Sequence, residues 1–246
     1  MDVYDSLTQL IKTADLDQTR KMKLLDYVDL VLADKNQFYS TEELFRWIDE
    51  IRLKNRVEIK EKDIGLLKNW IVDPVKGYIS HASGEFFKII GIEIKNTQRE
   101  VSGWDQPMIY QEEMGILGII RCKFNGINHY LLNAKIEAGN VLQYQISPTL
   151  QATYSNLKRA HGGRKPKFSE YFVEENGPHV VYKQWLAEDG GRFYLKTNLN
   201  MLVELDPSAL GEISDDFRWF TLSQIKLFLH RDNYINPHVR SILCHI

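Results

Sequence analysis

The sequence has few cysteines, no long apolar run and almost no net charge. Two cysteines, Cys122 and Cys244, are too few for a framework of several disulfides. No stretch reaches the roughly 20 consecutive apolar residues of a membrane-spanning helix, and Met1 to Ala14 mixes charged with apolar residues, unlike a signal peptide. The 31 lysines and arginines nearly balance the 33 aspartates and glutamates, so no overall field attracts nucleic acid or an anionic membrane. We therefore expect a cytoplasmic protein that binds neither nucleic acid nor membranes.

Several familiar catalytic motifs are also missing. The sequence contains no P-loop, no glycine fingerprint of dinucleotide-binding folds and no Gly-x-Ser-x-Gly elbow. The first two absences argue against a kinase and a nicotinamide-dependent dehydrogenase. His230, His238, Cys244 and His245 lack the paired ligand spacing of zinc motifs. We interpret these four residues as structural and expect neither a metal ion nor a cofactor.

The spacing of apolar residues predicts helices at both ends of an α+β fold. Apolar residues recur at helical spacing from Val3 to Asn55. Ser40 and Glu43 match a capping box, in which each side chain satisfies an otherwise unpaired amide, so a helix should begin near Thr41. Two further helices are expected after Asp215, over Thr221–His230 and Pro237–Cys244, with Asn236-Pro237 marking the break between them.

Between these helical regions the pattern is typical of β-strands. Asn125-Gly126 is a strong hairpin signal because both residues tolerate positive φ, and Glu188 to Gly191 should reverse the chain again. The predicted strand runs are Phe86–Ile94, Ile116–Phe124, Ile127–Ile136, Val180–Leu186 and Arg192–Leu205. We expect a helical arm over residues 1–66, for packing or dimerisation, followed by a domain over residues 67–246 built on a mixed or antiparallel sheet.

A polar stretch from Ala134 to Gly163 is the most unusual part of the sequence. Lys135 and Glu137 lie two residues apart, so on a strand they share a face, where one can hold the other in its charged form. Such a pair is either a catalytic acid and base or a surface ion pair at a strand end, which contributes only about 0 to 1 kcal/mol. The short residues that follow suit either a ligand-binding turn or the ordinary capping of helices and formation of turns; they are Ser147-Pro148-Thr149, Gln151, Thr153, Ser155 and Asn156.

One basic cluster follows this turn. It consists of Lys158, Arg159, His161, Arg164, Lys165 and Lys167, interrupted by Gly162-Gly163. Arginine and lysine make charge-assisted hydrogen bonds to phosphate oxygens, so the cluster suits a pyrophosphate. A solvated loop is the alternative, and a nucleic-acid patch is less favoured because no binding module accompanies it.

A series of motifs runs in order from about Trp70 onward. It comprises His81 with Gly84, Phe86-Phe87 and Gly91; Trp104 with Gln106-Pro107; Gly115 to Gly118; Ala134-Lys135 with Glu137 and Gly139-Asn140; Ser147-Pro148-Thr149 with Gln151-Ala152-Thr153 and Ser155-Asn156; His161-Gly162-Gly163; Tyr171-Phe172; Phe193-Tyr194; Asn198 with Asn200; Phe217-Arg218-Trp219; and Asn233 with Arg240. In this order the motifs resemble the NDP-hexose 2,3-dehydratase family of deoxysugar biosynthesis.

The resemblance implies a Nudix-like mixed β-sheet core flanked by helices, although the metal-binding Nudix box is missing. It also implies a substrate, a nucleotide-linked 4-keto-6-deoxyhexose, typically with dTDP as the nucleotide. The family removes water across C2 and C3 to give a 3,4-diketo-2,6-dideoxyhexose, which a downstream NADPH-dependent 3-ketoreductase then reduces. Many members carry two copies of the domain and this chain holds one, so we expect a homodimer.

The implied chemistry needs a base at C3, a donor at the C4 oxygen and an acid at the C2 hydroxyl. We expect Glu137, Lys135 and His161 among these groups, with Tyr154 and Tyr194 as further proton donors. The candidates for substrate binding are Arg159, Arg164, Arg192 and Arg218 at the diphosphate, Trp104 or Trp219 on the nucleobase unless these rings are simply core, and Gln106, Ser147, Thr149, Gln151, Thr153, Ser155, Asn156 and Asn198 along the rest of the substrate.

The sequence departs from the family pattern at two positions, and two other functions remain as alternatives. Ala138 stands where the family commonly has proline, and Tyr154 where a basic residue is frequent; these bear on the identity of the sugar or nucleotide. The alternatives to a dehydratase are a non-catalytic module that binds nucleotide sugars and a metal-dependent Nudix hydrolase.

Overall fold

The computed structural model describes residues 3–32, 38–95, 98, 100–157, 165–174 and 177–244, apart from the side chains of residues 29–32 and 155. The helices are α1 (Val3–Thr13), α2 (Gln18–Leu32), α3 (Thr41–Lys54), α4 (Tyr154–Leu157), α5 (Leu222–Leu229) and α6 (Pro237–Leu243). The strands are β1 (Trp70–Val72), β2 (Ile79–His81), β3 (Lys88–Lys95), β4 (Gly103–Tyr110), β5 (Gly115–Phe124), β6 (Ile127–Ile136), β7 (Tyr144–Ser147), β8 (Leu150–Thr153), β9 (Val180–Ala187), β10 (Phe193–Tyr194), β11 (Thr197–Leu205) and β12 (Phe217–Thr221). The α+β class is confirmed.

Local signals in the sequence produce several of these boundaries. At the start of α3 the Ser40 hydroxyl accepts from the Glu43 amide at 3.1 Å and the Glu43 carboxylate accepts from the Ser40 amide at 2.7 Å, which is the predicted capping box. Asn125 and Gly126 have φ values of 50° and 86° and join β5 to β6 as the predicted hairpin.

One predicted strand is divided in the structure. The run from Arg192 to Leu205 forms β10 and β11, with Leu195 between them at a φ of 54°. A left-handed residue breaks the extended path of a strand. The break lets β10 pair with β4 in one sheet while β11 pairs with β5 and β9 in another.

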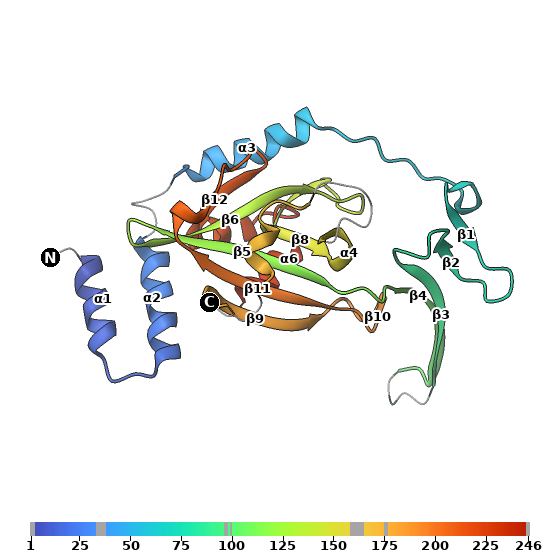
Figure 1. Cartoon of the computed structure of the whole chain (residues 1–246), viewed down its shortest axis with the longest axis horizontal. Coiled ribbons are helices and arrows are strands. Elements are labelled where there is room, and N and C mark those ends of the chain that lie inside the picture. Colours follow the sequence, from blue (N-terminus) through green and yellow to red (C-terminus); the bar gives the residue numbers. More distant parts are fainter. Residues whose placement is uncertain are drawn as a thin grey trace.

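The main sheet has the order β12-β6-β5-β11-β9, with β7 on β6 and β8 on β5. Its β5 and β11 are parallel, and its other pairs are antiparallel. The smaller sheet, β1-β2-β3-β4-β10, stands apart from it at the right of Figure 1. The sheet core is therefore mixed, as expected.

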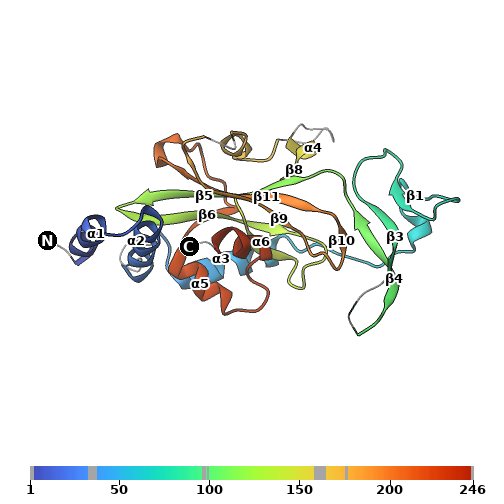
Figure 2. The ribbon, with the colours of Figure 1, turned by 90° about the horizontal axis from the view of Figure 1, so that it is seen from below.

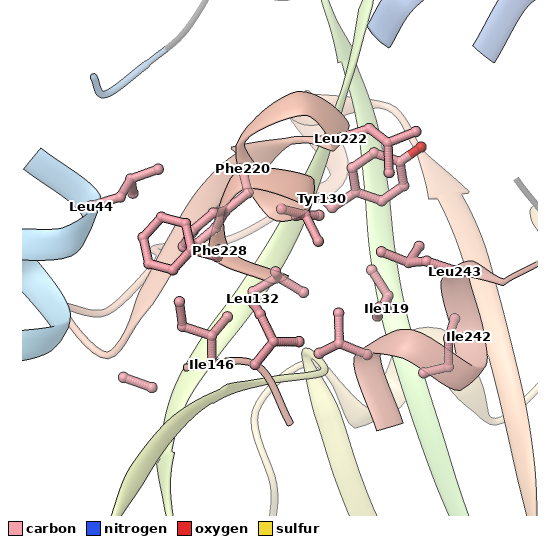
Figure 3. Close-up of a cluster of buried hydrophobic side chains, with 14 of the residues drawn as sticks. Leu44, Ile119, Tyr130, Leu132, Ile146, Phe220, Leu222, Phe228, Ile242 and Leu243 are labelled. Carbon is pink, nitrogen blue, oxygen red and sulfur yellow. The ribbon is translucent and has the colours of Figure 1, made fainter. Parts of the chain in front are cut away.

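Helices α3, α5 and α6 lie together on one side of the main sheet, and α4 lies on the other (Figure 2). The first side buries Leu44 of α3, Tyr130 and Leu132 of β6 and Phe228 of α5 in one hydrophobic cluster (Figure 3). Burial of large apolar side chains contributes about 1.5 to 3 kcal/mol each. This cluster fixes α6, and with it the residues at the start of α6, against the sheet.

Two helices of the predicted N-terminal arm contact the far end of the β5–β6 hairpin. In α1 the Tyr4 hydroxyl donates to the Gly126 carbonyl at 2.8 Å. In α2 the Asp26 carboxylate accepts from the Asn128 amide at 3.1 Å and lies 3.5 Å from the Arg121 guanidinium. None of the described helices combines the length and apolar character needed to cross a bilayer.

Candidate active site

The main sheet forks along its centre. Strands β5 and β6 pair from their hairpin only as far as Ile120 and Leu131. Beyond that point β5 pairs with β8 and β6 pairs with β7, so the turn between β7 and β8 enters the fork. Polar residues on the two branches therefore face a shared space that a continuous sheet would close.

Thr149 occupies the branch point. Its hydroxyl accepts from the Ile120 amide at 2.9 Å and donates to the Leu131 carbonyl. These are the two backbone groups that an uninterrupted antiparallel ladder would join directly. The Thr149 side chain thus satisfies both strands at the place where they separate.

A cleft of about 380 Å³ lies at the open end of the fork. It adjoins a second cavity of about 440 Å³, and both are lined by Leu117, Glu137, Glu188, Asn198 and His238. Each volume lies in the range of small-molecule sites. Charged and amide groups from β6, β8, β11, α6 and the end of β9 therefore meet at one ligand-sized space.

Glu137 is held from three directions. One carboxylate oxygen accepts from the Gln151 amide at 2.8 Å, and the other accepts from the Asn236 amide at 2.9 Å and from Asn140 at 3.4 Å. Asn236 is also the N-cap of α6, where its own oxygen accepts from the His238 backbone amide at 2.9 Å. The carboxylate is therefore fixed in orientation and tied to the start of α6.

Lys135 lines the same cleft as Glu137, as their two-residue spacing predicts. Burial lowers the pKa of Lys135, while the nearby Glu137 opposes this shift. Its ammonium nitrogen lies 3.4 Å from the Gln151 carbonyl. The amine is a hydrogen-bond donor close to whatever occupies the cleft.

A second acidic group comes from the turn after β9. The Glu188 carboxylate accepts from the side-chain amide of Asn198, whose oxygen accepts from the Gly115 amide at 3.0 Å. The Glu188 amide in turn donates to the Lys196 carbonyl at 3.0 Å. Lys196 is buried and donates to the Glu113 carbonyl, and this burial lowers its pKa. The network positions Glu188 and Lys196 on the wall opposite β6.

The interpretation of the C-terminal histidines and cysteine as structural residues needs correction for His238. Its half-buried side chain lines both cavities. Burial lowers the pKa of His238, Glu188 and Glu137 oppose that shift, and Lys135 adds to it. His230 and Cys244 are exposed, and His245 lies outside the described residues.

Six of the predicted site residues line the cleft: Lys135, Glu137, Gln151, Thr153, Asn156 and Asn198. Ser147 and Thr149 are instead buried in the β7–β8 turn, where they shape the fork. Their buried hydroxyls contact backbone carbonyls, which is the alternative that their residue types left open. His161, Arg159 and Arg164 lie outside the described residues, as does the Ser155 side chain.

Three aromatic residues that the sequence predicted for the site do not line the cleft. Trp219 is 7% exposed and packs edge-on against Phe124 at 5.1 Å between ring centroids. Tyr154 packs against a second hydrophobic cluster, the one that contains Trp219. Tyr194 lies 6.2 Å from the Tyr110 ring, whereas its neighbour Phe193 lines the cleft. Trp219 is therefore a core residue, whereas Tyr154 is half-buried at the edge of the core.

The remaining predicted contacts lie on the smaller sheet or beside α3. Trp104 donates to the Gln106 side chain at 2.7 Å, and Gln106 donates to the Gly191 carbonyl at 2.9 Å. Arg192 is exposed and pairs with Asp189 at 2.7 Å. These residues join the smaller sheet to the turn before β10.

Arg218 is engaged where β12 meets α3. Its guanidinium donates to the Phe217 carbonyl at 2.8 Å and lies 5.4 Å and 5.3 Å from the ring centroids of Tyr39 and Trp47. Among the residues that the structure describes, Lys135 and Lys196 are the basic side chains in the cleft besides His238.

Sequence reasoning missed Glu188, Lys196, Asn236 and His238 as site residues. Glu188 was interpreted only as part of a turn, and Asn236-Pro237 only as a break between helices. Asn236 followed by Pro237 does carry the signal of a helix N-cap, which places His238 in the first turn of α6. Only the packing of α6 on β5 and β11 brings that turn to Glu137.

Comparisons with known proteins show which family this chain resembles. A dTDP-4-dehydro-6-deoxy-alpha-D-glucopyranose 2,3-dehydratase of Amycolatopsis orientalis is 40% identical over 209 residues, which is 82% of this chain and 44% of that protein. The protein of the same name from Saccharopolyspora spinosa is 35% identical over 217 residues, 88% of this chain and 44% of that protein. The chain thus spans less than half the length of the curated relatives it matches.

Among solved structures, the crystal structure of Caenorhabditis elegans Ap4A hydrolase matches 54% of this chain and 94% of that one, with 12% identity and a TM-score of 0.31, which carries no argument about fold. The model of the family described as NDP-hexose 2,3-dehydratase matches residues 41–246. With two relatives at 35% identity or more over most of its length, the chain belongs to the NDP-hexose 2,3-dehydratase family.

Proposed function

We propose that this chain removes water across C2 and C3 of a nucleotide-linked 4-keto-6-deoxyglucose, with dTDP as the nucleotide. The observation that carries the proposal is the convergence of Lys135, Glu137, Glu188 and His238 on one cleft at the sheet fork. The printed names of the relatives support the same reaction and the same nucleotide.

The reaction is an elimination next to a ketone. The C4 carbonyl acidifies the hydrogen on C3, so a base in the cleft can remove it and leave an enolate with its charge on the C4 oxygen. The enolate expels the C2 hydroxyl as water once an acid supplies a proton. The resulting enol becomes the 3,4-diketo-2,6-dideoxyhexose by taking a proton at C2 and losing one from the C3 hydroxyl. No electrons enter or leave, so the elimination requires no redox cofactor.

Lys135 suits the role of donor to the C4 oxygen. Its amine is partly buried, where a hydrogen bond to a developing oxyanion is stronger than in water. A carboxylate or imidazole of the cleft then serves as base at C3 and returns the proton to the leaving hydroxyl. Gln151, Thr153 and Asn156 line the same space and offer hydrogen bonds to the sugar and diphosphate.

The decisive experiment supplies the keto-sugar to the chain without added metal. The product is trapped with an aromatic 1,2-diamine, which condenses with vicinal diketones, and the adduct is weighed by mass spectrometry. The expected adduct mass is that of the keto-sugar less one water, plus the diamine, less the two waters that the condensation itself releases. Binding of the keto-sugar without any adduct would instead identify a non-catalytic module, and release of sugar phosphate that depends on divalent metal would identify a Nudix-type hydrolase.

A matched pair of variants connects the activity to the cleft. Glu137→Gln keeps the shape and the contacts with neighbouring amides in part, but removes the charge. We expect diketone formation to fall by on the order of 100-fold or more. Glu212→Gln serves as the surface control, since Glu212 is exposed, and is expected to behave as wild type. Near-normal turnover of Glu137→Gln would remove Glu137 from the mechanism.

We also propose that the chain forms a homodimer in which a second copy stands for the additional length of the relatives. The proposal draws on the exposed apolar residues Val3, Leu7 and Leu10, which lie at helical spacing on α1 within the proposed arm of residues 1–66. Light scattering tests this, and a fully active monomer would contradict it. The variants Leu10→Asp and Leu10→Lys are expected to weaken the dimer without altering the cleft.

Three further parts of the proposal follow from the family. A Nudix-like core is proposed for the mixed sheet with helices on both sides, and an experimental structure that superposes on a Nudix hydrolase with a TM-score above 0.5 would test it. The diketone product is reactive, so we propose that an NADPH-dependent 3-ketoreductase consumes it in the same cytoplasmic compartment. A coupled assay in which NADPH oxidation requires both proteins tests that partnership.

A further inference from the structure

We propose that His238 is the base that removes the C3 proton, which rests on the dehydratase function proposed above and names the residue that performs its first step. His238 was not singled out by any motif, and it lies about a hundred residues from the Lys135–Glu137 pair. The fold brings it to the same cleft through the start of α6.

The position of His238 is fixed by the residues around it. Asn236 caps α6 by accepting from the His238 backbone amide at 2.9 Å, and the same Asn236 donates to Glu137 at 2.9 Å. The cap therefore sets the distance between the start of α6 and the catalytic strand β6. Val239 and Ile242, which are 1% and 0% exposed, anchor the helix in the core on its other face.

The imidazole of His238 is available to a ligand. Within the part of the chain that the structure describes, no group makes a hydrogen bond with either of its ring nitrogens, although the side chain is half-buried and lines both cavities. Buried polar groups normally have partners. A ring nitrogen without one, facing a ligand-sized space, is suited to a proton on the substrate.

The two carboxylates that could otherwise act as the base, Glu137 and Glu188, already accept hydrogen bonds from side-chain amides. Both oxygens of Glu137 accept amide hydrogen bonds, from Gln151 and from Asn236, and Glu188 accepts one from Asn198. These contacts hold the two carboxylates in place. They suit Glu137 and Glu188 to stabilising the imidazolium that forms when His238 takes a proton.

The charges around His238 support a neutral resting state. The titratable groups that face it are Lys135 of β6, Glu137 directly after that strand, and Glu188 from the turn after β9. Burial is the largest effect and lowers the pKa of His238, so the ring is neutral near pH 7 and free to accept a proton.

His238 carries the proton through the whole elimination, from C3 to the leaving hydroxyl. The neutral ring takes the C3 hydrogen as a proton, and the electron pair of that bond forms the enolate. The enolate then forms the C2–C3 double bond and breaks the C2–O bond, while the imidazolium protonates the departing hydroxyl. Water leaves, and His238 returns to its neutral form.

The test compares His238→Gln and His238→Ala with His230→Gln, an exposed histidine that serves as control. Each is assayed for diketone formation, for binding of the keto-sugar and for thermal unfolding. We expect both His238 variants to bind and fold as wild type, but to lose on the order of 100-fold or more in turnover, and we expect added imidazole to restore activity to His238→Ala. The acidic limb of the wild-type pH profile of kcat/KM should be absent from His238→Gln.

The outcomes separate this proposal from the function itself. If wild type forms no diketone, the dehydratase function fails. If wild type forms the diketone and His238→Gln stays within a factor of about 3 of it, or keeps the same acidic limb, His238 is not the base and the function stands. Loss of turnover in Glu188→Gln together with a fully active His238→Gln would assign the base to the carboxylate.

Discussion

Replacing Thr149 by valine isolates the hydroxyl at the sheet fork. Valine has nearly the same shape as threonine, but a methyl group takes the place of the hydroxyl. The Ile120 amide and the Leu131 carbonyl then lose their shared partner, and both residues are 0% exposed, so water cannot replace it. The methyl group also keeps the two strands from closing to bond each other directly.

The expected cost follows from these two backbone groups. A buried donor or acceptor left without a partner costs about 1 to 3 kcal/mol, so Thr149→Val should lower the free energy of unfolding by about 2 to 4 kcal/mol. This is a large part of the roughly 5 to 15 kcal/mol that holds a typical domain folded. Thr149→Ser keeps the hydroxyl and loses one methyl group, at a cost of about 1 kcal/mol.

Urea unfolding followed by tryptophan fluorescence measures the difference, with equal slopes required for the three proteins. Keto-sugar binding is measured on the folded fraction. If Thr149 instead bound the substrate, Thr149→Val would lose affinity with little change in stability. A Thr149→Val protein as stable as Thr149→Ser would refute the bridging role of the hydroxyl.

Three further predictions follow from the burial of ionisable groups. Lys135→Met should abolish most turnover yet raise the free energy of unfolding near pH 7, because burial disfavours the charged amine and lowers its pKa in the folded state. Chemical unfolding at pH 7 and at pH 10 should show this gain shrinking at the higher pH, where the amine is neutral in both states. The pKa of His238 in the folded state lies below its unfolded value of 6.5, so wild type should lose stability as pH falls below 6.5, and His238→Gln should lose less. If the free energy of unfolding changed equally between pH 8 and pH 5 in both proteins, this reasoning would be wrong. Burial raises the pKa of Cys122 to about 12, whereas Cys244 is exposed, so an aromatic disulfide reagent at pH 8 should titrate one thiol in the native protein and two after denaturation.

Local signals in the sequence were sufficient for much of the secondary structure. The capping box at Ser40 and the Asn125-Gly126 hairpin act through neighbouring atoms, and both are confirmed. Lys135 and Glu137 line the same cleft, as their spacing predicts, because alternate residues of a strand face the same way. Leu195 lay beyond this reasoning, since no local pattern marks a leucine for the left-handed conformation that divides β10 from β11.

The polar turn from Ser147 to Asn156 shows where residue type alone is ambiguous. Gln151, Thr153 and Asn156 line the cleft, whereas Ser147 and Thr149 are buried within the sheet. Hydroxyl groups serve ligands and backbones equally well. Which one they serve depends on the divergence of β5 and β6, which is a property of strand pairing and not of the turn itself.

Residue order and spacing over a few positions were enough to predict the family, the α+β class and the shared cleft of Lys135 and Glu137 at the end of β6. Tertiary structure alone decided the fork at Thr149, the core position of Trp219, and the meeting of Glu188 and His238 with Glu137. Those residues lie about fifty and a hundred positions from Glu137, and only the packing of α6 and β11 against the sheet closes that separation.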